Sequence, residues 1–176
     1  MANHSVSELE CVETDTCTEI AFTLNGAAVK TEVEPRQHIA DLLRYGFGLT
    51  GTHLGCEQGV CGACNIIVDG EVVRGCLMLA IQADGADVVT IEGLSESGAI
   101  ADLQDAFIRR NALQCGFCTS GMLMTAQALL QREPMPQRSY IRETISGNIC
   151  RCTGYHAIVD AIELTAQQRH EARNAK

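Results

Sequence analysis

Cysteines are the residues of this chain whose type and spacing could do chemistry, and ten among 176 residues is a high number. Eight of them form two groups of four, one in each half of the chain, whereas Cys11 and Cys17 lie near the N-terminus. No apolar segment typical of a signal peptide precedes them, which predicts a cytoplasmic protein. In a reducing compartment, cysteines at this density indicate metal or redox chemistry more often than disulfides.

The first group has the spacing C-x4-C-x2-C followed by a fourth cysteine, which is the spacing of plant-type ferredoxins that hold a [2Fe–2S] cluster. Its members are Cys56, Cys61, Cys64 and Cys76. Gly55, Gly59 and Gly62 are expected to adopt positive φ, so that the loop can wrap a cluster and direct amide N–H groups at its sulfurs. A zinc site is the alternative, but zinc favours paired C-x2-C motifs, and the gap of four residues fits them less well.

The second group also offers four thiolates, the number that one [2Fe–2S] cluster requires. Its members are Cys115, Cys118, Cys150 and Cys152. We expect Cys118 to open one helix and Cys152 to precede another that is capped by Thr153, because helix N-termini stabilise anions. The alternative for Cys115 and Cys118 alone is a thioredoxin-like dithiol, which would leave the other two cysteines unexplained.

Four further residues could take part in this chemistry. Cys11 and Cys17 are expected to be free thiols, because no third or fourth ligand accompanies them. His53 could replace a cluster ligand, as histidines do in Rieske centres, but four cysteines are already present and we expect a hydrogen-bonding role. Arg151 lies between two cysteines of the second group and is expected to screen the charge of a cluster or to pair with a partner.

Alternating hydrophobicity predicts a small α+β domain around the first group, over residues 15–93, preceded by a flexible tail at residues 1–14. Strands are predicted over residues 18–24, 29–33, 66–68, 72–73 and 87–91, and short helices over residues 39–45 and 77–81. Asn25-Gly26 and Asp69-Gly70 are strong signals for tight hairpin turns between strands.

Apolar residues recur at helical spacing in four segments after Gly93, which predicts a four-helix bundle over residues 98–168. These segments are Ile100–Phe107, Met122–Leu129, Ile141–Ile149 and Ile158–Thr165. The polar residues 169–176 are expected to be a flexible tail.

Charge and composition exclude two classes of function. The formal net charge is −9, with 13 basic and 22 acidic residues, and the chain contains no tryptophan. Nucleic-acid binding would need a basic stripe and stacking aromatic residues, so it is not expected. No apolar run approaches the roughly 18 residues that span a bilayer, so no membrane span is expected.

Both cysteine groups, with the residues around them, resemble the small iron–sulfur subunit of the molybdenum hydroxylases. The matching segments are GCEQGVCGAC with the fourth cysteine of its group, QCGFC and CRCTGY. This family includes xanthine dehydrogenase, aldehyde oxidoreductase, carbon monoxide dehydrogenase and N-heteroaromatic hydroxylases. The resemblance covers residues 18–168 and implies a β-grasp [2Fe–2S] domain followed by a helical [2Fe–2S] domain. One departure is Ser120, where the family commonly has proline, and both residues are tolerated at a helix start.

The resemblance also implies roles for individual residues and partners. The first four cysteines would hold the cluster near a flavin, and the second four would hold the cluster nearest the molybdenum centre. Gln114 corresponds to the family glutamine that touches the pterin on the large subunit, and Cys115 or Cys152 would contact the pterin as well. The implied partners are a large molybdopterin-binding subunit and a medium FAD-binding subunit, in a dimer of heterotrimers.

The chain lacks a Rossmann glycine fingerprint and room for flavin and molybdopterin domains, so substrate oxidation is expected on partner chains and no catalytic residue on this one. We therefore predict an electron-transfer subunit that links a molybdenum cofactor to a flavin through two [2Fe–2S] clusters. A freely diffusing ferredoxin, which would need only the first domain, and a zinc-binding interaction module are the alternatives. The expected substrate of the complex is an N-heteroaromatic ring, and an aldehyde, a purine or carbon monoxide are the alternatives.

Overall fold

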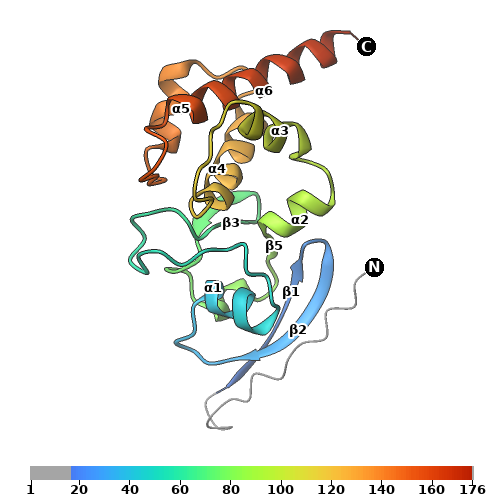
Figure 1. Ribbon diagram of the computed structural model, residues 1–176. Coiled ribbons are helices and arrows are strands. Elements are labelled where there is room, and N and C mark those ends of the chain that lie inside the picture. The colour runs from blue at the N-terminus through green and yellow to red at the C-terminus, as the bar shows by residue number, and fades with distance from the viewer. Residues whose placement is uncertain (1–16, 176) are drawn as a thin grey trace.

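The computed structural model describes residues 17–175, in which a mixed sheet carries a group of helices (Figure 1). The strands are β1 (Thr18–Leu24), β2 (Ala27–Val33), β3 (Asn65–Val68), β4 (Glu71–Arg74) and β5 (Asp87–Val89). Their order is β2-β1-β5-β3-β4, and only β1 and β5 pair in parallel. With a short helix packed on one face, this is the expected β-grasp arrangement of an α+β fold.

Both predicted hairpins are present, and their turns have the expected geometry. Asn25 and Gly26 have φ of 51° and 82°, and Asp69 and Gly70 have φ of 50° and 83°. Positive φ at both central residues is the type I′ pattern, whose twist matches that of the flanking strands. The second hairpin brings Cys76, two residues after the end of β4, back toward the loop that precedes β3.

The short helical segments differ from the prediction in detail. Helix α1 (Ile39–Asp41) continues as a π-helical turn, η1 (Leu42–Gly46), and a 3₁₀ turn, η2 (Ala80–Ala83), replaces the helix expected at residues 77–81. The later start of η2 has a local cause, because the N–H groups of residues 77 and 78 donate to the Arg74 carbonyl in a tight turn around Cys76.

Strand β3 is buried on both faces, and this joins the two halves of the molecule. Ile66 and Val68 pack with Leu42 in the core of the sheet domain, whereas Ile67 packs in the core of the helices. Successive side chains of a strand point to opposite faces, so one short strand contributes to both cores. The helical core therefore includes side chains from the sheet.

Five helices follow the sheet, one more than expected. They are α2 (Ile91–Glu96), α3 (Ala101–Arg109), α4 (Thr119–Arg132), α5 (Arg138–Ile145) and α6 (His156–Asn174). Helix α5 ends before Ile149, which is 48% exposed rather than part of a helix. No helix within residues 17–175 is long and apolar enough to cross a membrane.

Helix α6 continues through most of the segment that was expected to be a flexible tail. Its side chain Arg169 donates to both carboxylate oxygens of Asp102 on α3, at 2.7 and 2.8 Å, and to Gln127 on α4 at 3.0 Å. Hydrogen bonds from Arg169 hold the pKa of Asp102 below its usual value, so the pair is ionised at neutral pH. These bonds tie Arg169, the first residue of that segment, to two other helices, and the chain remains helical as far as Asn174.

Candidate iron–sulfur sites

The first group of cysteines lies on one long loop and one short turn of the sheet domain. Cys56, Cys61 and Cys64 belong to the loop between η1 and β3, and Cys76 follows β4. Cys64 and Cys76 are buried, whereas Cys56 and Cys61 are half-buried. The group therefore has one side in the protein and one side toward solvent.

Positive φ angles shape this loop, but not at all the expected positions. Gly59 and Gly62 have φ of 80° and 72°, as expected, and Glu57 joins them with φ of 51°. Gly55 does not have positive φ, which corrects the prediction. It instead allows a close approach, because a Cβ at this position would lie 3.2 Å from the Cys61 sulfur.

The loop prepares one thiol for deprotonation and keeps another protonated. N–H groups of Gln58 and Cys61 lower the pKa of Cys56 to about 6, and the Cys61 N–H lies 3.3 Å from the Cys56 sulfur. Burial raises the pKa of Cys64 to about 11, with the Cys76 thiol beside it. The thiolate is the form that ligates metals, so binding at the buried side must release protons.

The second group of cysteines lies at the start of one helix and in the loop before another. Cys118 is the N-cap of α4, as predicted, and Cys115 precedes it in the same turn. Cys150 and Cys152 lie in the loop between α5 and α6. Cys115 and Cys152 are exposed, with their sulfurs 3.6 Å apart, and burial together with the Cys150 thiol raises the pKa of Cys118 to about 12.

Thr153 is not the N-cap of α6, which corrects the prediction. Tyr155 takes that position with φ of 70°, and its hydroxyl accepts a hydrogen bond from the Cys150 N–H at 2.8 Å. The Thr153 hydroxyl lies 3.1 Å from the Cys150 sulfur instead. Burial acts to raise the pKa of Cys150, but the hydroxyl and N–H of Thr153 bring it below its usual value. Thr153 therefore stabilises a thiolate rather than a helix end.

In each group the thiols are arranged as two neighbouring pairs. The pairs are Cys56 with Cys61, Cys64 with Cys76, Cys115 with Cys152, and Cys118 with Cys150. Zinc needs four ligands around one point, whereas a [2Fe–2S] cluster divides four thiolates between two irons. The donor sets thus fit the cluster better than zinc.

Gln114 lies at the surface beside two exposed thiols. Its side-chain amide donates a hydrogen bond to the Cys152 carbonyl at 3.1 Å. The structure therefore brings together Gln114, Cys115 and Cys152, the residues expected to face a pterin, although 37 positions separate the two cysteines.

The four further residues have different outcomes. His53 lies 2.8 Å from the Phe117 carbonyl and stacks on the Phe117 ring at 4.8 Å, so its expected hydrogen-bonding role is confirmed. Arg151 is exposed, and its role stays a prediction. Cys17 is disulfide-bonded, which corrects the expectation of a free thiol, and Cys11 lies outside the described residues.

The two loops that carry the thiol groups touch each other directly. The Ile149 N–H donates to the Cys61 carbonyl at 2.8 Å, which joins the residue before Cys150 to a member of the first group. Arg74 spans both loops, because it donates to the Gly59 carbonyl at 3.1 Å and to the Gly147 carbonyl at 2.7 Å. This contact was not predicted from the sequence.

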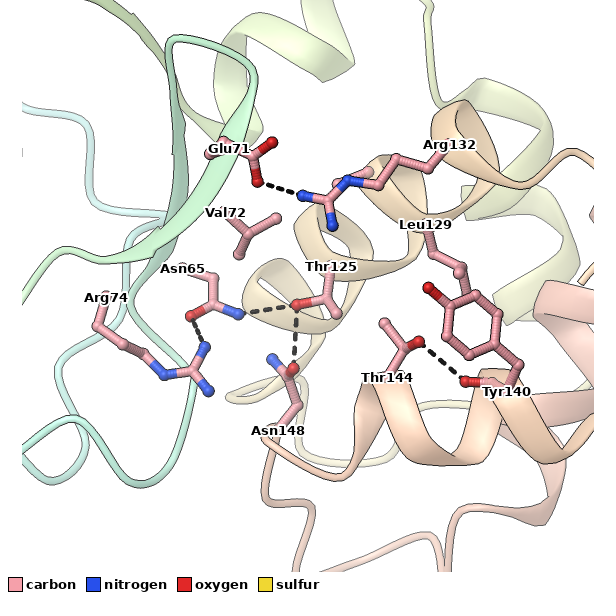
Figure 2. Close-up of a pocket in the computed structure, with 11 residues that line it drawn as sticks. Asn65, Glu71, Val72, Arg74, Thr125, Leu129, Arg132, Tyr140, Thr144 and Asn148 are labelled. Atoms are coloured by element: carbon pink, nitrogen blue, oxygen red, sulfur yellow. Dashed lines mark hydrogen bonds and ion pairs between the residues drawn. The ribbon is translucent and has the colours of Figure 1, made fainter.

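A pocket of about 310 Å³ opens beside this contact, between the β3–β4 hairpin and helices α4 and α5 (Figure 2). Arg74 on one side bonds to the Asn65 side chain, and Asn65 in turn points to Thr125 on α4. Asn65 at the start of an apolar strand and Arg74, two residues before Cys76, were the only signals in the sequence for this network.

Comparison with known proteins shows to which family this chain belongs. Residues 22–88 match the family described as "2Fe-2S iron-sulfur cluster binding domain", and residues 90–163 match "[2Fe-2S] binding domain". The nicotine 6-hydroxylase small subunit of Paenarthrobacter nicotinovorans is 52% identical over 144 residues, which are 82% of this chain and 87% of that protein. This chain is a small iron–sulfur subunit of the molybdenum hydroxylase family.

Other members of the family are similar in sequence and in structure. The caffeine dehydrogenase subunit gamma of Pseudomonas sp. strain CBB1 is 50% identical, over 82% of this chain and 88% of that protein. The crystal structure of quinoline 2-oxidoreductase from Pseudomonas putida 86 superposes with a TM-score of 0.84 at 51% identity, over 89% of this chain and 98% of that chain.

Membership of the molybdenum hydroxylase family confirms the expected fold, cofactors and function. The chain combines a ferredoxin-like and a helical domain, each of which binds a [2Fe–2S] cluster. It is the electron-transfer subunit of an oxidoreductase complex in which molybdopterin and FAD are carried by a large and a medium partner subunit.

Proposed function

We propose that each thiol group holds one [2Fe–2S] cluster. Cys56, Cys61, Cys64 and Cys76 are assigned to one cluster, and Cys115, Cys118, Cys150 and Cys152 to the other. The observation that carries this assignment is the arrangement of each group as two neighbouring pairs of thiols. Each cluster, when bound, takes up and passes on one electron. We divide the chain between residues 93 and 98, with the helical domain extended to Asn174 by α6.

The second thiol group faces the molybdopterin subunit in this proposal, and the first faces the FAD subunit. Gln114 supports the first part, because its amide is exposed at the surface beside two exposed thiols and can both donate and accept hydrogen bonds. Val60 and Leu77 support the second part, since they expose 55% and 58% of their surface around the first group. Exposed apolar side chains in one place are typical of partner contacts.

The full complex is proposed to be a dimer of heterotrimers in the cytoplasm that hydroxylates an N-heteroaromatic ring. The names of the relatives support this substrate class, because they refer to nicotine, caffeine and quinoline.

Replacing Gln114 by alanine in the assembled complex is expected to slow bleaching of the clusters by substrate about fivefold, because one amide hydrogen bond is worth about 1 kcal/mol. Both clusters are expected to remain assembled, since Gln114 is not a ligand. Rapid-mixing absorbance measurements test this, with Gln131→Ala at the exposed end of α4 as the matched control. An unchanged bleaching rate in a stable complex would show that this surface does not face the molybdenum centre.

A further inference from the structure

Gly121 lies in the first turn of α4, three residues after Cys118, and packs against the loop of the first thiol group. A Cβ at Gly121 would overlap the carbonyl oxygen of Gly62 and would lie 3.0 Å from the carbonyl oxygen of Ala63. Both carbonyls belong to the residues between Cys61 and Cys64. Because the neighbours are backbone atoms, only glycine permits this approach of the two segments.

Gly62 is confined from the other side by the loop that carries Cys150 and Cys152 of the second thiol group. A Cβ at Gly62 would lie 2.5 Å from the Gly147 carbonyl oxygen and 2.8 Å from the Asn148 side-chain nitrogen. Gly147 and Asn148 belong to the loop that carries Cys150. The backbone at Gly62 is therefore enclosed by the start of α4 on one side and by this loop on the other.

Buried hydrogen bonds hold α4, the loop of the first thiol group and the loop before α6 in one relative position (Figure 2). The Thr125 hydroxyl, one turn after Gly121, accepts from the Asn65 amide at 2.8 Å and donates to the Asn148 amide oxygen at 2.9 Å. Asn148 in turn donates to the Gly62 carbonyl at 3.1 Å. Asn65, Thr125 and Asn148 expose only 2%, 7% and 1% of their surface. Separation of the segments would leave these buried groups unpaired, which is costly.

We propose that Gly121, held by the Asn65–Thr125–Asn148 hydrogen bonds, fixes the spacing between the two thiol groups and hence between the clusters that they hold. Gly121 is thus a positioning residue, since it touches neither cluster ligand nor substrate. The proposal rests on the assignment of the eight ligands under Proposed function. It matters for electron transfer because tunnelling weakens steeply as the gap between redox centres grows.

The test is the magnetic coupling between the two reduced clusters in the assembled complex, measured by pulsed EPR. Gly121→Ala is expected to keep its iron and both signals, but to lower the dipolar coupling, which falls with the cube of the distance. Gly93→Ala is the control, because a Cβ there lies 2.8 Å from the Cβ of Asn25 and meets no cluster loop. Its coupling is expected to equal that of the unmodified protein.

If Gly121→Ala loses iron, two substitutions at Thr125 test the proposal instead. Thr125→Val removes the hydroxyl but keeps the shape of the side chain, and a weaker or broader distribution of couplings is expected. Thr125→Ser restores the hydroxyl, and recovery of the original coupling is expected. The proposal is overturned if Thr125→Val leaves the coupling unchanged, if Thr125→Ser fails to restore it, or if a folded, iron-replete Gly121→Ala couples normally. Absence of two clusters from the unmodified complex would instead contradict the ligand assignment.

Discussion

Replacement of Cys76 by serine is expected to abolish one of the two EPR signals of the reduced protein and about half of its iron, and Cys150→Ser is expected to abolish the other signal. The reason is that Cys76 is buried beside Cys64 in the sheet domain, whereas Cys150 is buried beside Cys118 among the helices. A serine hydroxyl is far less acidic than a thiol, so serine is a much poorer ligand for iron than cysteine. Each remaining signal should keep nearly its original shape.

The control for these substitutions is a cysteine outside both groups. Cys17→Ser and Cys11→Ser should retain the full iron content and both signals. Loss of both signals on substitution of either Cys76 or Cys150 would show that the two clusters are not held independently.

Replacement of Arg74 by methionine is expected to lower the free energy of unfolding by about 3 kcal/mol, or the melting temperature by roughly 6–12 °C. Arg74 donates to carbonyls of both cluster loops and to the Asn65 side chain, and methionine has similar length but no donor. Partly buried acceptors would lose their partners, and both loops would loosen together. Thermal unfolding followed by circular dichroism measures the effect.

Arg132→Met is the matched control, because this arginine lines the same pocket but pairs only with Glu71 in an exposed ion pair (Figure 2). Exposed pairs contribute less than about 1 kcal/mol, so a small effect is expected. Equal destabilisation by the two substitutions would contradict the bridging role of Arg74.

Local sequence signals predicted the parts of the molecule that depend on neighbouring residues. The turns at Asn25-Gly26 and Asp69-Gly70 need positive φ, which these residue pairs adopt readily, and both hairpins formed as expected. The spacing of the cysteines likewise indicated two groups of four, because loop length and residue type are written in the sequence itself. Helix α4 begins where Cys118 was expected to open it.

Contacts between distant segments could not be predicted in this way. Asn65 and Thr125 are 60 residues apart, and only the packing of α4 on β3 brings their polar groups together. The stacking of His53 on Phe117 has the same origin. Thr153 suggested a helix cap by its type, but the nearby thiol of Cys150 competes for its hydroxyl.

The assignment of two [2Fe–2S] clusters to eight cysteines can be checked by the iron and acid-labile sulfide content of the purified protein. This assignment requires about four iron atoms and four sulfides per chain, from two clusters with four thiolates each. A content near two irons per chain, or zinc in stoichiometric amount, would contradict it.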